Sequence, residues 1–423
     1  GQMMATAEPM LRRQLPHGLT DLVGEPAAAK TALEDVLQMT FRRWSYARII
    51  PPTFEYSDSI ATGASPQLLD ETYRFFDREG RMLALRTDMT VPTARVVGAK
   101  LYDQPLPLRF YYIGNVFRHE EPQAGRRREF TQAGIELIGA GTPDADAEVL
   151  AVVVDALQAM GVAEFQINLG QVAYLKGILA EGRLSNGDLY RIEQAISRKN
   201  DVELAQTLAA LGIEGDAGRA VRAIPHLCGG EEALDEAERL AVNAAAREAI
   251  AWLRRVYALA QAEGIAEHII LDLSEVRSMA YYTGITFHTY VAGLGFHICS
   301  GGRYDGLIAN FGADLPAVGF ALGVERIMLV TRPQVEISPQ VLIQTNERAE
   351  GYALAALARQ RGLRVEIEAL GRRGNDLLTY ARERQARYLV VCEGAEYYTL
   401  SDGAAHRIVT RAEIEKEIVA WAL

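Results

Sequence analysis

The sequence predicts an α+β fold: an antiparallel sheet flanked by helices, with a helical insertion and a small C-terminal α/β domain. Three observations lead to this prediction. Strand-like segments between Arg81 and Ala140 are joined by short polar turns, and connections of hairpin length cannot join parallel strands. Residues 180–262 are rich in Ala, Leu and Glu and predict helices. Strand-like segments precede this stretch and resume after it. Beyond Pro333, short strands alternate with helices, as in a largely parallel sheet.

The first part of the chain indicates a long helix followed by sheet strands. Apolar residues at helical spacing predict a helix over 27–45. The following stretch, Ala47 to Phe54, has a strand-like pattern and contains Pro51-Pro52. The next strands are predicted at Met82–Leu85, Leu108–Val116, Phe130–Ile138 and Phe165–Leu169. A strongly apolar helix is predicted between the last two, at Asp146–Met160.

The remaining elements divide the chain into a core over 9–332 and a second domain over 339–423. Two helices are predicted in the insertion over Asp188–Leu211, and a last core helix follows Gly319. The later core strands are predicted at His268–Leu273, Gly284–Val291 and Gly295–Cys299. The second domain is expected to alternate strands and helices at Val341–Gln344, Arg348–Arg361, Leu363–Glu368, Asn375–Gln385 and Tyr388–Cys392.

Composition limits the class of partner. A net charge of -11 gives no overall attraction to a polyanion, which favours a small-molecule or protein partner over nucleic acid. No run approaches the ~18 apolar residues of a membrane span, and the N-terminus lacks the layout of a secretion signal. Cys228, Cys299 and Cys392 are far apart and lack zinc-ligand spacing. We therefore expect a cytoplasmic protein without a structural metal.

A predicted hairpin between Phe117 and Ile138 gathers polar side chains. Its loop carries consecutive arginines, Arg126 to Arg128. Its returning strand places four residues on one face by period-two alternation: Phe130, Gln132, Gly134 and Glu136. Guanidinium groups bind phosphate or carboxylate, whereas Gln and Glu can receive an amino group or an imidazole N–H. Taken alone, the same pattern fits a solvated basic hairpin tip equally well.

Three further clusters are weak in isolation. Arg277 to Gly284 carries Tyr281-Tyr282 beside an arginine, which ordinary strand packing with a surface cation also explains. Cys299 to Leu307 contains paired glycines that permit a tight turn or a close approach to a ligand, and such turns are common. Pro316 to Arg326 indicates a strand that breaks into a helix, and its glycines need mean no more than close packing.

In their order and spacing, and with Leu85 to Thr90 upstream, these clusters resemble the class II histidyl-tRNA synthetase family over nearly the whole chain. The hairpin matches motif 2 of that family and Pro316 to Arg326 matches motif 3. Arg277 to Thr283 and Ser300 to Leu307 match its two histidine-specific motifs. A chance match of all of them in order is negligible. The resemblance implies a class II aminoacyl-tRNA synthetase-like sheet and a C-terminal domain like an anticodon-binding domain.

The resemblance also implies the residues of two adjoining pockets. The histidine-binding set is Asp88, Thr90 and Gln132 for the α-amino group, Arg277 for the carboxylate, Glu136 and Tyr282 for the imidazole, and Tyr281 beside them. The positions that bind ATP in synthetases are matched by Arg118, Glu120, Arg126, Phe130 and Arg326. The first set is chemically reasonable, because a zwitterion needs partners of both signs and an imidazole can donate its N–H to a buried carboxylate.

Several departures point from the synthetases to a paralogous family, the regulatory subunits of ATP phosphoribosyltransferase. Asp88-Met89-Thr90 stands where synthetases have Glu-Gly-Thr, Glu121 where they have a second Arg, and Ala280 where they have an Asp. The insertion carries Ala195 to Asp201 and Ile224 to Gly230 in place of an Asn-Pro-Leu-Arg-type segment. The retained Arg277 and the C-terminal domain, which many of those regulatory subunits lack, favour the synthetases instead.

These observations predict a regulatory subunit that partners the short-form catalytic subunit of ATP phosphoribosyltransferase in the first step of histidine biosynthesis. It would sense histidine for feedback control, need no cofactor and charge no tRNA. The class II likeness implies a homodimer, formed through the helix before Trp44 and the strand to Phe54, within a hetero-oligomer. The chief alternative is an active histidyl-tRNA synthetase using ATP and Mg. A free-standing histidine sensor is a third.

Overall fold

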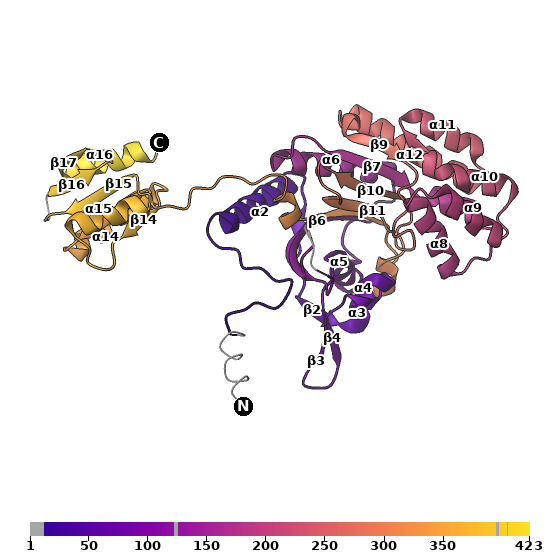
Figure 1. Ribbon diagram of the computed structural model, residues 1–423, viewed down its shortest axis with the longest axis horizontal. Helices are drawn as coiled ribbons and strands as arrows, with labels where there is room; N and C mark the ends of the chain where they lie inside the picture. The colour runs from indigo at the N-terminus through magenta and orange to yellow at the C-terminus, as the bar shows by residue number, and fades with distance from the viewer. Residues whose placement is uncertain (1–11, 122–125, 395–396, 404) are drawn as a thin grey trace. The chain divides into compact units, whose positions relative to one another are not determined.

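The computed structural model describes residues 12–121, 126–394, 397–403 and 405–423. The chain divides into two compact units, one ending at Pro333 and the other running from Gln334 to Leu423. In the described part of the chain, the first unit is built on a nine-stranded sheet and the second on a five-stranded sheet, each with flanking helices (Figure 1). The predicted α+β class is confirmed.

The large sheet brings together strands from distant parts of the sequence. Its order is β1 (Ala47–Arg48), β5 (Leu108–Phe117), β6 (Glu129–Ile138), β12 (Ala317–Gly323), β11 (Cys299–Arg303), β10 (Ile285–Tyr290), β7 (Gln166–Gln171), β9 (Ile269–Asp272) and β8 (Cys228–Gly229). The pairs β1–β5 and β7–β9 are parallel and the other pairs are antiparallel. The β5–β6 hairpin follows the predicted boundaries closely.

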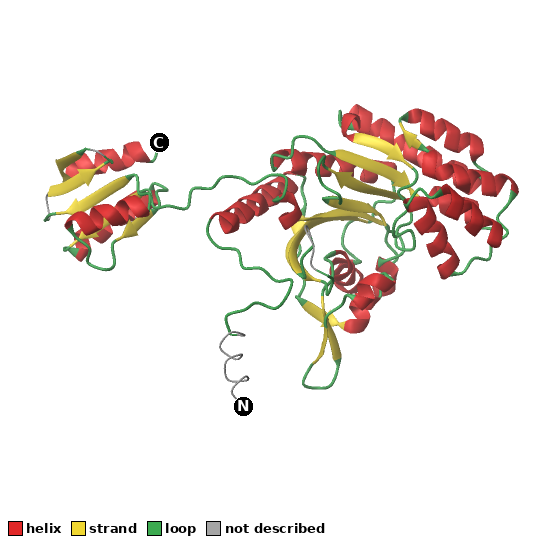
Figure 2. Ribbon diagram, in the orientation of Figure 1, coloured by secondary structure: helices red, strands yellow, loops and turns green. Residues whose placement is uncertain are grey.

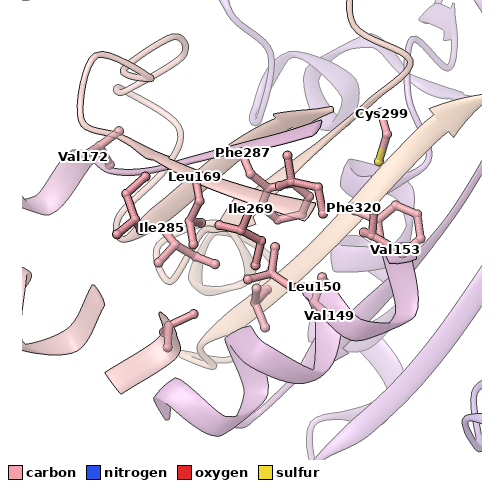
Figure 3. Packing of buried hydrophobic residues seen from close by; sticks show 14 of the residues in the cluster. Val149, Leu150, Val153, Leu169, Val172, Ile269, Ile285, Phe287, Cys299 and Phe320 are labelled. Atoms are coloured by element: carbon pink, nitrogen blue, oxygen red, sulfur yellow. The ribbon is translucent and has the colours of Figure 1, made fainter. Parts of the chain in front are cut away.

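One face of this sheet forms the hydrophobic core. Helices α2 (Glu25–Arg43) and α6 (Pro143–Ala159) cover it, and α5 (Thr90–Val96) lies over the opposite face (Figure 1). Val149, Leu150 and Val153 of α6 pack among buried strand residues that include Leu169, Ile285, Phe287 and Phe320 (Figure 3). Each such side chain contributes roughly 1.5–3 kcal/mol on burial, so this face is structural and the α5 face is left for a site.

The insertion is mainly helical. Its helices are α8 (Asn186–Ser197), α9 (Asp201–Ala210), α10 (Gly215–Ala223), α11 (Glu231–Leu240) and α12 (Ala244–Ala262), which lie together in Figure 2. It follows α7 (Val172–Leu179) and packs back on the core through α12, which contacts α6 and α7. The insertion also supplies the short strand β8, which pairs with β9 and extends the large sheet.

The predicted strand at Gly295–Cys299 is wrong, and the helix predicted after Gly319 begins a few residues later than expected. The strand β11 starts at Cys299 and includes Gly301-Gly302, the pair interpreted as a turn. A Cβ on Gly301 would lie 2.3 Å from the Gly319 carbonyl oxygen, and one on Gly302 would lie 2.5 Å from that of Ile285. The glycines are therefore needed for close packing inside the sheet. Likewise β12 continues past Gly319, and helix α13 (Val324–Ile327) follows it.

The predicted strand at Ala47–Phe54 is divided between two sheets. Strand β1 joins the large sheet, whereas β2 (Phe54–Tyr56) pairs with β4 (Met82–Leu85), which also pairs with β3 (Arg74–Phe76). Pro51 and Pro52 lie between them and have no N–H to donate to a ladder. The short helices α3 (Ser57–Ala61) and α4 (Pro66–Asp70) follow β2.

The second unit has a mixed sheet, so the prediction of a largely parallel one is wrong. The strand order is β14 (Val365–Ile367), β13 (Val341–Thr345), β15 (Tyr388–Cys392), β16 (Tyr397–Ser401) and β17 (His406–Thr410). The first three are parallel, but hairpin-length connections make β15–β16 and β16–β17 antiparallel. The helices are α14 (Arg348–Gln360), α15 (Gly374–Glu383) and α16 (Arg411–Trp421). None of the helices described has both the length and the apolarity to cross a membrane.

Candidate functional site

A cavity of about 380 Å³ lies on the sheet face away from the α6 core. Ala133, Ile135 and Leu137 of β6 face that core, so alternation directs the side chain of Gln132 to the cavity side. The cavity is lined by all the residues predicted for the ATP-like pocket, namely Arg118, Glu120, Arg126, Phe130 and Arg326. It is also lined by three residues of the predicted histidine-binding set: Gln132, Arg277 and Tyr282. The structure thus brings the two predicted pockets together.

Glu136 lies in a buried layer behind this cavity, with only 1% of its surface exposed. Its Oε1 accepts hydrogen bonds from Thr90 Oγ1 at 2.8 Å and Tyr112 OH at 2.9 Å, and its Oε2 accepts one from Tyr304 OH. A Cβ on Gly319 would lie 2.0 Å from Oε2, so this glycine makes room for the carboxylate. Burial raises the pKa of Glu136 to about 7, although the three hydroxyl groups lower it.

The remaining predicted histidine-binding residues also lie near Glu136 rather than along the cavity wall. Asp88 Oδ1 accepts a hydrogen bond from the Val91 N–H at 3.0 Å in the first turn of α5, and burial raises the pKa of Asp88. Tyr281 stacks on Tyr304 with ring centroids 5.5 Å apart and meets the Tyr282 ring edge-on at 4.9 Å. Asp88, Thr90, Glu136 and Tyr281 therefore form the support behind the lining residues.

Gln132 connects the cavity to α5. Its Oε1 accepts a hydrogen bond from the Met89 N–H at 2.8 Å, and its side chain is mostly buried. This bond uses one lone pair of the amide oxygen and fixes the orientation of the amide plane. The remaining lone pair and the amide N–H groups are the ones that a ligand in the cavity can meet.

Guanidinium groups dominate the other end of the cavity. Arg118 lies over the Phe130 ring at 5.2 Å, and its Nε donates to the Thr87 carbonyl at 3.0 Å. Arg326 lies over the Phe296 ring at 4.8 Å and donates to a backbone carbonyl at 2.7 Å. Burial and the neighbouring cations lower the pKa of Arg326. Converging cations held in this way favour an anionic ligand.

The arginines of the hairpin loop do not all contribute. Arg126 and Arg127 line the cavity. Arg128 instead donates to the backbone carbonyls of Glu120 at 3.1 Å and His17 at 3.2 Å. Arg128 therefore holds the chain around the hairpin.

Four polar residues beside the cavity were not found from the sequence: Glu275, His288, Tyr290 and His297. His288 and His297 line the cavity, and their ring centroids are 4.7 Å apart. Burial lowers the pKa of both imidazoles, so both are neutral at pH 7. Period-two alternation within the predicted strand Gly284–Val291 could have placed His288 and Tyr290 on one face. Glu275 and His297 lie outside strands, and no pattern marks them.

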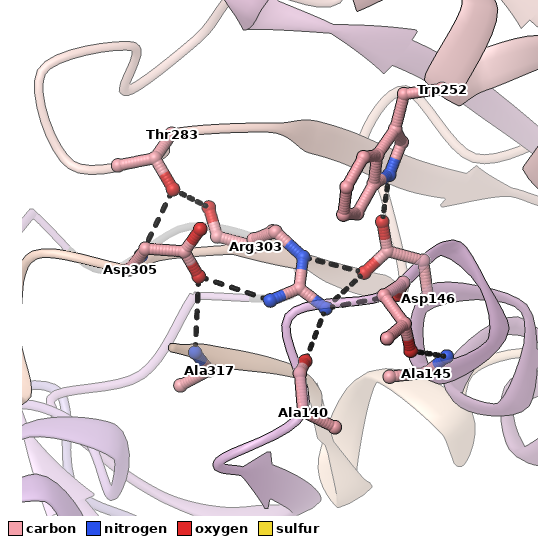
Figure 4. Close-up of polar contacts among 9 residues, drawn as sticks. Ala140, Ala145, Asp146, Trp252, Thr283, Arg303, Asp305 and Ala317 are labelled. Carbon is pink, nitrogen blue, oxygen red and sulfur yellow. Dashed lines mark hydrogen bonds and ion pairs between the residues drawn. The ribbon is translucent and has the colours of Figure 1, made fainter. Parts of the chain in front are cut away.

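The loop that carries Tyr281 and Tyr282 is anchored from behind by a buried ionic cluster (Figure 4). The backbone carbonyl of Arg303 accepts a hydrogen bond from the Thr283 N–H at 2.8 Å. The guanidinium group of Arg303 binds Asp146 at 2.8 Å and Asp305 at 3.0 Å, and Trp252 Nε1 donates to Asp146 at 2.6 Å. The cluster therefore ties the cavity loop to α6 and to the insertion helix α12.

Comparisons with known proteins agree with this geometry. Residues 18–327 match the family model described as histidyl-tRNA synthetase. The ATP phosphoribosyltransferase regulatory subunit of Geobacter sulfurreducens is 38% identical over 417 residues, covering 95% of this chain and 95% of the relative. That of Thermoanaerobacter pseudethanolicus is 40% identical over 361 residues, covering 84% of this chain and 93% of the relative.

Solved structures of related proteins also resemble this chain. A structure described as an ATP phosphoribosyltransferase regulatory subunit/histidyl-tRNA synthetase from Bacillus halodurans has a TM-score of 0.80 and 30% identity, and the match covers 90% of this chain and 98% of that one. The histidyl-tRNA synthetase of Nostoc sp. PCC 7120 has a TM-score of 0.77 at 21% identity, covering 96% of this chain and 99% of that one. The second match shows the shared fold alone.

Proposed function

Because the chain belongs to the histidyl-tRNA synthetase family and, within it, to the ATP phosphoribosyltransferase regulatory subunits, we propose that it binds free histidine and regulates the catalytic subunit of that enzyme. The observation that carries this proposal is the convergence of Gln132, Arg277 and Tyr282 on one cavity in front of the buried Glu136. Gln132 suits the amino group of a histidine ligand, Arg277 its carboxylate, and Tyr282 with Glu136 its imidazole.

The buried carboxylate is suited to an imidazole. Oε1 of Glu136 already accepts two hydroxyl groups, whereas Oε2 accepts only that of Tyr304 among the described residues. A lone pair of Oε2 therefore remains for an imidazole N–H. The carboxylate of histidine would face Arg277, and its amino group would lie between Gln132 and the carboxylate of Asp88.

Feedback control requires that histidine bind two states of the complex with different affinities, because a ligand of equal affinity shifts no equilibrium. We propose a homodimer of this chain within a hetero-oligomer with the short-form catalytic subunit. Histidine would stabilise the less active state of that assembly. Nucleic acid is not expected to be a partner, and the second unit would serve the assembly rather than a tRNA.

Mixing this chain with a short-form catalytic subunit should give a complex larger than either protein alone. Coupling between sites typically amounts to ~1–3 kcal/mol, so histidine should inhibit the phosphoribosyltransferase activity of the complex by ~5- to 150-fold. Size-exclusion chromatography with light scattering, together with activity assays at several histidine concentrations, would measure both effects. Separate elution at micromolar concentrations of both proteins would reject the partnership.

The synthetase alternative makes the opposite prediction. A synthetase would transfer radioactive histidine to tRNA in the presence of ATP and Mg, whereas the regulatory subunit should give no more product than a reaction without protein. Robust aminoacylation by the purified chain would reject the proposed function, even if histidine binds.

Glu121 tests whether the cationic end of the cavity is weakened for nucleotide. Its side chain is exposed and carries the charge that replaces a synthetase arginine. Glu121→Arg should tighten ATP binding by about two- to tenfold at low salt and by less at 0.5 M salt, because exposed charges are screened. Calorimetry would compare it with Glu79→Arg, the same charge change on the exposed β3–β4 turn. Equal effects of both variants would reject the interpretation of Glu121.

A further inference from the structure

Arg277, the residue expected to face the ligand carboxylate, already faces a carboxylate of its own chain. Its Nη2 donates to Glu275 Oε2 at 3.2 Å and to Tyr290 OH. Tyr290 OH in turn donates to Glu275 Oε1 at 3.4 Å. The three side chains thus close a ring of hydrogen bonds beside the cavity, and one acceptor in that ring carries a negative charge.

Glu275 is built into the fold rather than placed there by a flexible side chain. It is 6% exposed, and β7 leaves room for it at Gly170, where a Cβ would lie 3.0 Å from the Glu275 Cβ. His288 Nδ1 lies 2.9 Å from Glu275 Oε2. The carboxylate therefore cannot swing away to solvent without disturbing buried neighbours.

The charges of this cluster nearly cancel. Burial raises the pKa of Glu275, but its contacts with His288 and Arg277 outweigh burial and lower that pKa, so the carboxylate is charged at neutral pH. Burial keeps His288 neutral by lowering its pKa. Arg277 contributes one positive charge and Glu275 one negative charge, and an incoming carboxylate meets a guanidinium that is already neutralised.

We propose that Glu275 is a specificity-determining residue of the histidine site, an internal counter-ion of Arg277 that keeps the affinity for the ligand's carboxylate low. The inference rests on the proposed function, because it concerns the same ligand. Its physical basis is that a negative charge on Glu275 repels a carboxylate that approaches Arg277 and competes with it for the same donor. Selectivity among ligands then depends mainly on contacts with the imidazole.

The test compares histidine with histidinol, which has a hydroxymethyl group in place of the carboxylate. In the unchanged chain, calorimetry should find histidine less than about tenfold tighter than histidinol, because Arg277 is already paired. Glu275→Gln keeps the shape and a hydrogen-bond acceptor but removes the charge. It should tighten histidine binding by about tenfold or more and leave histidinol within about twofold.

Two control variants separate charge from other effects. Tyr290→Phe removes the other partner of Arg277 Nη2 without a change in charge, and it should give no gain that is selective for histidine. Glu383→Gln, on the exposed face of α15 in the second unit, tests the change in net charge alone and should affect neither ligand.

The outcomes distinguish this inference from the proposed function. Histidine binding with no selective gain in Glu275→Gln, or with an equal gain in Tyr290→Phe, would overturn the inference and keep the histidine site. A preference of the unchanged chain for histidine of more than about a hundredfold would also overturn it, even if Glu275→Gln fails to fold. No binding of histidine by the unchanged chain would overturn both.

Discussion

Glu136→Ala should weaken the binding of free histidine by at least about thirtyfold, because removal of one partner from a buried charged hydrogen bond costs ~2–5 kcal/mol. Burial and the charge of Glu136 raise the pKa of Tyr282, which lines the cavity, and burial raises the pKa of Glu136 itself to about 7. In the complex with the catalytic subunit, the same substitution should relieve inhibition by histidine. Calorimetry on the chain alone and inhibition curves on the complex would measure the two effects.

Two further variants control for damage to the buried layer. Glu136→Ala also leaves the hydroxyl groups of Thr90, Tyr112 and Tyr304 without their acceptor, so thermal unfolding must be recorded alongside binding. Glu136→Gln keeps the shape and should still bind histidine more weakly. Tyr112→Phe removes one of the three hydroxyl groups that donate to Glu136 and should weaken binding much less than Glu136→Ala does, because two donors remain and Tyr112 is not among the residues that line the cavity. Unchanged affinity in both Glu136 variants would remove Glu136 from the site, whereas unchanged inhibition alone would place the effector elsewhere in the complex.

Asp146→Ala should lower the free energy of unfolding of the first unit by about 3–5 kcal/mol, because it leaves the charge of Arg303 buried with a single remaining carboxylate partner. Asp146 is fully buried and Arg303 is 2% exposed. Burial raises the pKa of Asp146 to about 6 even though Arg303 lowers it. The ion pair thus adds little net stability as a whole, yet loss of one partner is costly. Denaturant unfolding followed by circular dichroism would measure the change.

The exposed pair Arg219–Asp216 is the matched control, since its side chains are 64% and 81% exposed. Asp216→Ala should change the free energy of unfolding by no more than about 0.5 kcal/mol. Arg303→Met should cost about as much as Asp146→Ala, and the double variant should cost less than the sum of the two. Strict additivity would contradict the account of Arg303 and Asp146 as one coupled unit.

The sequence was sufficient where a pattern is local. The β5–β6 hairpin and the face that carries Gln132 follow from period-two alternation, which fixes the orientation of a side chain once the strand is recognised. The residues predicted for the ATP-like pocket lie in motifs of compact spacing, and all of them line the cavity. Each of these motifs is a short stretch of sequence, so its residues can be recognised without knowledge of the fold.

The sequence by itself therefore determined the fold class and part of the cavity lining, whereas the tertiary structure decided which of the predicted residues line the cavity and which lie behind it. Glu136 and Tyr304 are 168 positions apart, and the pairing of β6 with β12 and of β12 with β11 brings them into contact. The same pairing explains the glycines interpreted as a turn, which are small because neighbouring strands approach them. Glu275 became part of the site only when β10 placed Tyr290 and His288 beside it. Contacts between strands far apart in the sequence, unlike those within a hairpin, depend on pairing across several strands of the sheet, which the pattern of one segment does not specify.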